Sequence, residues 1–210
     1  STTEDKRWLK VRDDYYYHLK GKGHKKYHGN EHEGYHENFG AINSKVKWED
    51  SWDHFVGNEA CKFINEYGKE KPFAMMVGFP GPHDPYDPSE DFDKAMPDEN
   101  KMPAPIKGNP NDAKIHKKNM MEGWKYPWAD LDYEGLTESK IKKMRAHYAA
   151  LIQQIDYEVG RIIDSLKENG LIDNTVIIFA TDHGDYMGDH GLFGKGTFIE
   201  SSSHIPLIVQ

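Results

Sequence analysis

Cysteine is nearly absent from this 210-residue chain, which carries only Cys61. No disulfide can therefore form within the chain, and its compartment stays open between periplasmic, secreted and cytoplasmic. Long apolar runs are missing as well, because no stretch approaches the ~18 residues that a transmembrane helix requires. No signal peptide is recognisable either. We therefore expect no membrane partner.

Net positive charge is also lacking. The chain has 27 Lys and Arg residues against 35 Asp and Glu, which gives a net charge of −8. Nucleic-acid phosphates are usually bound by a basic surface, so we expect no nucleic-acid partner. A single cation or metal can still bind a small anion on an acidic protein. The balance of charge thus excludes one class of partner and leaves small anionic substrates open.

The first 45 residues are polar and rich in Tyr and His, and we expect them to form a segment separate from a domain at 46–210. Four histidines recur at every fourth position: His24, His28, His32 and His36. On a helix this spacing would align them on one face, where they could bind a metal. Several glycines interrupt the segment, however, and each weakens a helix by ~1 kcal/mol. We therefore expect a surface loop or an extended segment with no specific metal role.

Two later segments have the periodicity of helices. Residues 50–68 repeat apolar side chains at helical spacing, and Cys61 lies among them as an ordinary helix residue. A longer helix is predicted over 137–169, because Thr137 is a typical N-cap and a broad apolar stripe follows it. Glu158 falls outside that stripe, so we expect it to be solvated.

The residues between these two segments include a long stretch without strong periodicity, 89–135. A stretch of this length is typical of a functional loop or a flexible insertion. Its aromatic residues Trp124, Tyr126 and Trp128 either anchor the loop on the core or line a pocket. We favour anchoring.

Three apolar runs predict buried strands, at 73–79, 176–179 and 205–209. Apolar, β-branched runs bounded by turn signals are typical of strands in a parallel sheet. The long helix, a short turn and the run at 176–179 form the second half of an α/β crossover. We therefore expect an α/β fold with a mostly parallel sheet flanked by helices.

Residues that carry chemistry follow two of these runs. Asp182 and His183 come directly after the run at 176–179, and Lys195 follows in a Gly-rich loop. Ligands of open α/β sheets bind beyond the carboxyl ends of the strands. His83 lies in a proline-rich loop after the first run, where a rigid backbone suits acid–base work or oxyanion binding. This set suggests a metal site for an anionic substrate; the alternative is a solvated turn after a core strand.

These motifs resemble the central part of a sulfatase, in the alkaline-phosphatase superfamily. The resemblance covers roughly residues 48–209 and is specific, because separated motifs occur in the family's order. It implies an alkaline-phosphatase-like fold and a hydrolase of sulfuric esters, acting on a small-molecule or carbohydrate sulfate. The matching stretches are Lys71-Pro72-Phe73, Pro82-His83-Asp84-Pro85, Thr181-Asp182-His183-Gly184-Asp185, Gly188 to Glu200 and Ile205-Pro206-Leu207-Ile208-Val209.

The resemblance also implies a role for each candidate residue. Asp182 and His183 match two ligands of a divalent metal, for which Ca²⁺ is the first expectation and Mg²⁺, Mn²⁺ or Zn²⁺ are alternatives. His83 matches the histidine that contacts the sulfate and helps to protonate the leaving oxygen, and Lys195 matches the sulfate-binding lysine. Many sulfatases have Asn where this chain has His183. Histidine there also occurs in relatives that act on choline sulfate, phosphonates or phosphate esters, so a phosphonate or phosphate mono- or diester hydrolase is the alternative.

The chain departs from the family pattern at the nucleophile. A Cys-x-Pro-x-Arg motif, whose Cys is converted to formylglycine, is absent, and Cys61 is followed by Lys-Phe-Ile. The family's strand ending in paired Asp is absent too, and Gly21-Lys22-Gly23-His24 only imitates its Gly-Lys-x-His segment. We expect an internal piece of a longer enzyme, inactive alone, that associates with itself or with the missing segments. A non-catalytic anion-binding module is the rival interpretation.

Overall fold

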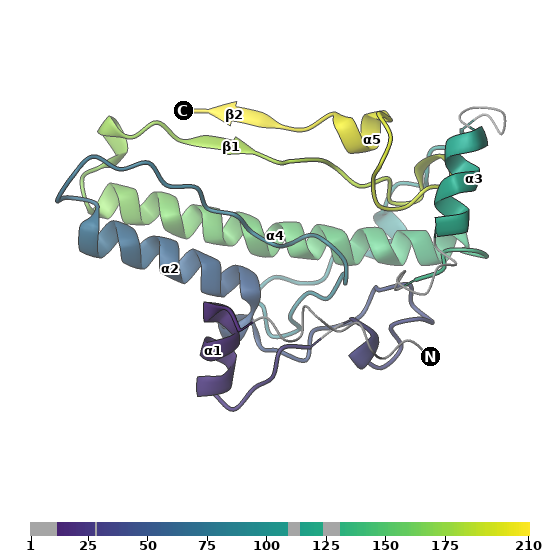
Figure 1. Cartoon of the computed structure of the whole chain (residues 1–210), viewed down its shortest axis with the longest axis horizontal. Coiled ribbons are helices and arrows are strands. Elements are labelled where there is room, and N and C mark those ends of the chain that lie inside the picture. The colour runs from purple at the N-terminus through teal and green to yellow at the C-terminus, as the bar shows by residue number, and fades with distance from the viewer. Residues whose placement is uncertain (1–11, 28, 109–113, 124–130) are drawn as a thin grey trace. The chain divides into compact units, whose positions relative to one another are not determined.

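The computed structural model describes residues 12–27, 29–108, 114–123 and 131–210. Two compact units share the chain: residues 1–97 with 147–175, and residues 98–146 with 176–210. Trp124, Tyr126 and Trp128, which were expected to anchor the long loop, lie outside the described residues, and so does His28. The boundary expected at residue 45 stays a prediction. Figure 1 shows the helices α1 (Asp14–Gly21), α2 (Trp52–Tyr67), α3 (Lys114–Gly123), α4 (Glu138–Glu168) and α5 (Glu200–Ser203), and the strands β1 (Ile178–Ala180) and β2 (Leu207–Val209).

Both predicted long helices are confirmed. The hydroxyl of Ser51 accepts the backbone N–H of His54 at 3.3 Å and so caps α2, within which Cys61 is buried. Thr137 caps α4 through its hydroxyl, which accepts the N–H of Lys140 at 3.4 Å. Local capping and apolar spacing are signals that the sequence carries by itself. Among the described residues, no helix combines the length and apolarity that crossing a bilayer requires.

The expected solvation of Glu158 is wrong. Its side chain is fully buried in the first unit, where Oε1 lies 2.8 Å from His54 Nδ1 and Oε2 accepts a hydrogen bond from Arg161 at 2.7 Å. A buried carboxylate is tolerated when cations and hydrogen-bond donors offset the loss of hydration. Glu158 therefore ties α2 to α4 within this unit.

The expected absence of helix from the first 45 residues is wrong for α1. Asp13 caps it by accepting the backbone N–H of Tyr16 at 2.7 Å. Tyr15 and Leu19, four residues apart, lie on one face of the helix and pack with Val46 in a buried cluster. Tertiary packing thus supports a helix that its propensity alone would not. The equally spaced histidines that the structure describes lie beyond α1 in loops and turns, and His32 is buried rather than on the surface.

The expected parallel sheet is not found in the described residues. Their one sheet is an antiparallel pair of β1 and β2, with Phe179 opposite Ile208. Parallel pairing needs a crossover, usually a helix, and the segment joining these strands contains only a three-residue 3₁₀ helix, Asp189–Gly191, and the four-residue α5. Residues 73–79 form no strand.

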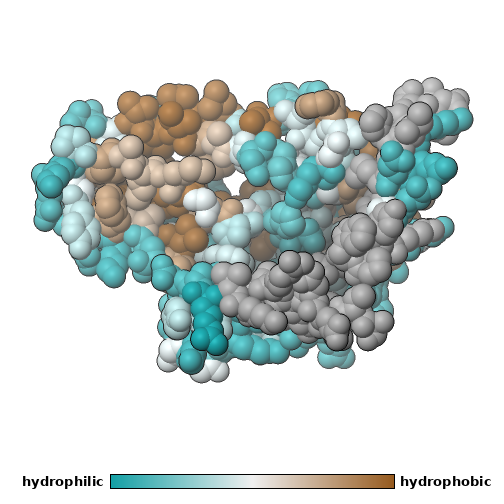
Figure 2. Space-filling model, viewed as in Figure 1, coloured by the Kyte–Doolittle hydropathy of each residue, from teal (hydrophilic) through white to brown (hydrophobic). Residues whose placement is uncertain are grey.

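The strands are exposed, whereas we expected them to be buried. Every residue of β1 and β2 is exposed, as is Val176 before them. Figure 2 shows apolar side chains gathered along this pair of strands. Met76, in the run that forms no strand, is 97% exposed. Among the described residues, the apolar strands that the sequence pattern assigned to a core are therefore exposed.

Candidate functional site

Asp182 and His183 occupy the turn that leaves β1. The Asp182 carboxylate is 86% exposed, and its Oδ1 accepts the backbone N–H of His183 at 2.8 Å. His183 Nδ1 lies 2.8 Å from the carbonyl oxygen of Gly184. A carbonyl oxygen only accepts, so Nδ1 donates to it and Nε2 is the ring nitrogen that could bind a metal. Nε2 lies 3.5 Å from Asp182 Oδ2, so two atoms of metal-binding types lie close together.

Gly184 fixes the turn against α5. Its N–H donates to the carbonyl oxygen of Ser202 at 2.9 Å. A Cβ at this position would lie only 2.1 Å from the backbone oxygen of Ser201, so no other residue fits without moving α5. The short helix thus sets the position from which Asp182 and His183 project.

The turn is joined to the loop that carries Lys195. Asp185 Oδ1 accepts the backbone N–H groups of Met187 at 2.8 Å and of Gly194 at 3.1 Å. Tyr186 is fully buried, and its N–H donates to the carbonyl oxygen of Gly194 at 2.9 Å. Gly194, which precedes Lys195, is therefore hydrogen-bonded to both Asp185 and Tyr186, which follow the Asp182-His183 turn. The Lys195 side chain itself is exposed.

A largely buried ion pair also stabilises this loop. Arg145 Nη2 lies 2.7 Å from Asp189 Oδ1, with both side chains largely buried, and Arg145 Nε donates to the carbonyl oxygen of Met187 at 3.0 Å. Asp189 Oδ1 also accepts the N–H of Ile106 at 2.8 Å. Sequence reasoning missed these supporting residues. The one available signal was the stretch Gly188 to Glu200, which contains Asp189 and matches the sulfatase pattern, but no role was assigned to Asp189.

His83 belongs to the first unit, whereas Asp182, His183 and Lys195 belong to the second. It lies in a loop at 80–88, and its side chain is more than half exposed. Its Nδ1 lies 2.9 Å from the carbonyl oxygen of Asp84 and 3.0 Å from the Oδ1 of the same residue. Both atoms are acceptors, so Nδ1 donates, and the neighbouring carboxylate offsets positive charge on the ring. The site predicted from the sequence thus falls into two parts, one in each unit.

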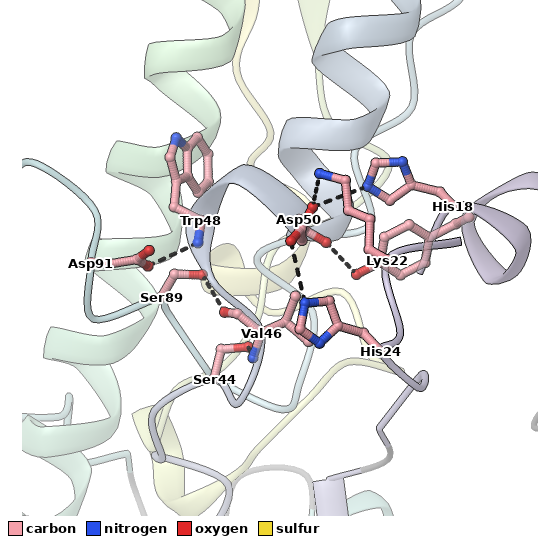
Figure 3. Close-up of polar contacts among 10 residues, drawn as sticks. His18, Lys22, His24, Ser44, Val46, Trp48, Asp50, Ser89 and Asp91 are labelled. Carbon is pink, nitrogen blue, oxygen red and sulfur yellow. Dashed lines mark hydrogen bonds and ion pairs between the residues drawn. The ribbon is translucent and has the colours of Figure 1, made fainter. Parts of the chain in front are cut away.

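The segment Gly21-Lys22-Gly23-His24 takes part in a different cluster, around Asp50. Figure 3 shows Lys22, His18 and His24 directed at this carboxylate. Lys22 donates a hydrogen bond to Asp50 Oδ1, while the Nε2 atoms of His18 and His24 lie 3.4 Å and 3.5 Å from its oxygens. Burial works against ionisation of Asp50, but Lys22 and the two histidines outweigh it and hold the pKa below its usual range. This Lys and this His are therefore committed to a buried carboxylate.

The donor set after β1 fits part of a metal site. A carboxylate and a neutral imidazole are ligands that divalent cations accept in proteins. The carbonyl oxygen of Gly184 holds the imidazole in the required tautomer, as an outer-shell partner usually does. In the part of the chain that the structure describes, no group of three or more His, Cys, Asp or Glu residues could hold a metal. Asp182 and His183 alone would therefore provide only part of a metal site.

Known proteins share this arrangement of motifs. The chain matches the model of the Sulfatase family over residues 6–210. It belongs to the sulfatase family. An arylsulfatase of Clostridium perfringens is 32% identical over 161 residues, which cover 74% of this chain and 31% of that protein. A multifunctional alkaline phosphatase superfamily protein of Trinickia caryophylli is 34% identical over 189 residues, which cover 85% of this chain and 36% of that protein. This sulfatase chain thus spans about a third of the length of these two relatives.

Two solved structures with a similar fold are phosphonate monoester hydrolases. That from Silicibacter pomeroyi has a TM-score of 0.72 and 24% identity, and the match covers 96% of this chain and 42% of that chain. That of Agrobacterium radiobacter has a TM-score of 0.66 and 25% identity, over 80% of this chain and 34% of that chain. The described helices and strands therefore belong to a fold found in larger hydrolases.

Proposed function

We propose that this chain supplies metal ligands and sulfate-binding side chains to a hydrolase of sulfuric esters. The proposal rests on one observation: in a chain of the sulfatase family, Asp182 Oδ2 and His183 Nε2 lie 3.5 Å apart, on a turn that is hydrogen-bonded to the Lys195 loop. The sequence holds no Cys-x-Pro-x-Arg motif. We therefore assign the covalent nucleophile to a segment outside these 210 residues.

Each candidate residue has a role that its chemistry can perform. Asp182 and His183 would hold a divalent metal, which supplies the charge that polarises the ester. Lys195 would contact the non-bridging oxygens of the sulfate, where an ammonium stabilises negative charge as it develops. His83, whose Nδ1 is engaged by Asp84, would give a proton from Nε2 to the leaving oxygen. Ca²⁺ or Mg²⁺ suits a site completed by oxygens, while the imidazole also admits Mn²⁺ or Zn²⁺.

The substrate class follows from the named relatives. One is an arylsulfatase, and another, of Rhizobium meliloti, is a choline-sulfatase that is 28% identical over 80% of this chain. We propose a small-molecule or carbohydrate sulfate ester as the substrate.

Turnover of an aryl sulfate tests both halves of the proposal. The isolated 210-residue chain is expected to show no turnover with any of the four metals. The longer protein from the same gene is expected to hydrolyse the ester, and to lose activity when a chelator removes the metal. Substantial metal-dependent turnover by the isolated chain would contradict an outside nucleophile. A longer protein without turnover, and without a Cys-x-Pro-x-Arg motif, would favour the non-catalytic anion-binding module.

A phosphonate or phosphate ester hydrolase is the second candidate, and His183 favours it. A phosphonate monoester hydrolase of Agrobacterium radiobacter, 25% identical to this chain, also has this fold. Comparing kcat/KM for matched sulfate, phosphate and phosphonate esters on the longer protein separates the two candidates. We expect the sulfate to be preferred.

The exposed apolar strands suggest a further partner for this chain. Exposed strands present unpaired backbone groups, and exposed apolar patches are typical of interfaces. We propose that β1 and β2 contact the remaining segments of the longer protein, or a second copy when those segments are absent. In sedimentation experiments the isolated chain should therefore associate with itself, and replacing Ile208 with Lys should reduce that association. A chain that stays monomeric at all concentrations would contradict this proposal.

A further inference from the structure

Asp53 is a buried carboxylate next to the loop that carries His83. It is the second residue of α2, and only 7% of it is exposed. Its Oδ1 accepts the backbone N–H of Gly81 at 3.1 Å. Burial raises the pKa of Asp53 to about 6, a rise to which the negative charge of Glu158 adds and against which the N–H of Gly81 acts. None of the roles assigned above uses this residue.

The contact between Asp53 and Gly81 is close as well as polar. A Cβ at position 81 would lie 2.5 Å from Asp53 Oδ2 and 3.2 Å from Ile155 Cδ1. Only a glycine allows the backbone to approach the carboxylate this closely. Burying a carboxylate destabilises the fold relative to an apolar side chain of similar size, unless hydrogen bonds offset the lost hydration. Here the bond fixes the first turn of the loop.

The other end of the loop is held independently. The N–H of Tyr86 donates to the carbonyl oxygen of Gly40 at 2.9 Å, and the N–H of Ile42 donates to the carbonyl oxygen of Tyr86 at 3.2 Å. The buried His147 adds to this, since its Nδ1 lies 3.1 Å from the same Tyr86 oxygen. His83 lies between the two held ends. The N–H of His83 donates to the carbonyl oxygen of Pro80 at 3.3 Å, next to Gly81, so the Gly81 end helps to set how the His83 side chain leaves the loop.

We propose that Asp53 is a positioning residue for His83: by holding the Gly81 amide it sets the direction of the His83 imidazole. The inference rests on the proposed function in one respect, because the position of His83 matters to a reaction only if His83 donates the proton to the leaving oxygen. Asp53 itself touches no reacting group in this account. Its effect on the loop is a property of this chain and can be measured without turnover.

The test is an NMR experiment on the full 210-residue chain with ¹³C-labelled histidine. The His83 signal is assigned by its loss in His83→Gln. Asp53→Ala should shift the ring signal of His83 and move its titration midpoint, and should speed exchange of the Gly81 amide about tenfold, as loss of one hydrogen bond predicts. Asp53→Asn should restore values close to the unmodified chain, because its amide oxygen can accept the same bond.

The control is Asp91→Ala. Asp91 Oδ1 also accepts a backbone N–H in the same unit, that of Trp48 at 2.8 Å, but it is not bonded to the His83 loop. This variant should leave the His83 signal unchanged. A folded Asp53→Ala with an unaltered His83 signal would overturn the proposal. If that variant does not fold, Gly81→Ala replaces it, since its methyl group must displace the carboxylate or the loop; an unaltered His83 signal there would overturn the proposal equally.

Activity of the longer protein separates this inference from the proposed function. If His83 donates the proton, Asp53→Ala should lower kcat more for esters with poor leaving groups than for those with good ones. A shifted His83 signal without any change in kcat would support positioning by Asp53 and would contradict the catalytic role of His83.

Discussion

Two regions of this chain contain the same side chains and use them differently. Around Asp50, a lysine and two histidines meet a carboxylate whose side chain is only 4% exposed. After β1, a histidine meets the carboxylate of Asp182, which is 86% exposed, and a lysine follows on a bonded loop. In the first set, the lysine and both histidines contact the buried carboxylate. The second leaves the Asp182 carboxylate open to solvent. Residue types alone therefore do not distinguish a structural cluster from a candidate site.

The comparison is tested most strongly by Asp182→Asn. We expect turnover of an aryl sulfate by the longer protein to fall at least ~100-fold, because the proposed metal ligand, which would support several kcal/mol of charge stabilisation, is lost. The free energy of unfolding of the 210-residue chain should change by no more than ~0.5 kcal/mol, as is usual for an exposed side chain. Kinetics and urea denaturation measure the two effects. A large loss of stability would place Asp182 among the structural carboxylates.

Asp50→Ala should have the opposite profile. Removing one partner from a buried ion pair costs about 3–5 kcal/mol, and we expect about 2–3 kcal/mol because Lys22 can still reach water. Urea denaturation of the 210-residue chain measures this loss, with Asp182→Ala as the matched control. Should the two substitutions cost the same, the distinction between a closed and an open cluster would fail.

The two lysines extend the comparison at a smaller scale. Lys22→Met should lower the free energy of unfolding by about 1 kcal/mol, since Asp50 loses a hydrogen bond from a charged donor but keeps its histidines. Lys195→Met should leave the free energy of unfolding within ~0.5 kcal/mol while raising the KM for the sulfate ester in the longer protein. If Lys22→Met changed only the kinetics, the resemblance of Gly21-Lys22-Gly23-His24 to the family's segment would be functional after all.

The sequence predicted the features that depend on neighbours along the chain. The caps and apolar spacing of α2 and α4 are local signals, and both helices formed as expected. Glu158 was misplaced because its partner His54 lies 104 residues away, and no local pattern carries that contact. The antiparallel pairing of β1 and β2 depends on how the segment between them folds. Asp182 and His183 could be predicted from a sequence motif. The contact of Asp53 with the His83 loop could not, because it depends on how α2 and that loop pack in the fold.

The smallest expected effect is on the pH dependence of stability, which should differ between Asp50 and Asp53. The pKa of Asp50 is lowered by folding, so its ionised form stabilises the chain above the unfolded pKa of about 3.8 and this contribution is lost as pH falls through the lower folded value. The pKa of Asp53 is raised to about 6, so its contribution is present below pH 3.8 and is lost as pH rises towards 6. Asp50→Asn should therefore differ from the unmodified chain in stability at pH 7 and approach it below pH 3.8. Asp53→Asn should instead flatten the loss of stability between pH 4 and 6. Urea midpoints across this range measure both changes, and if the two variants follow the same pH curve, the cations around Asp50 do not stabilise its charge.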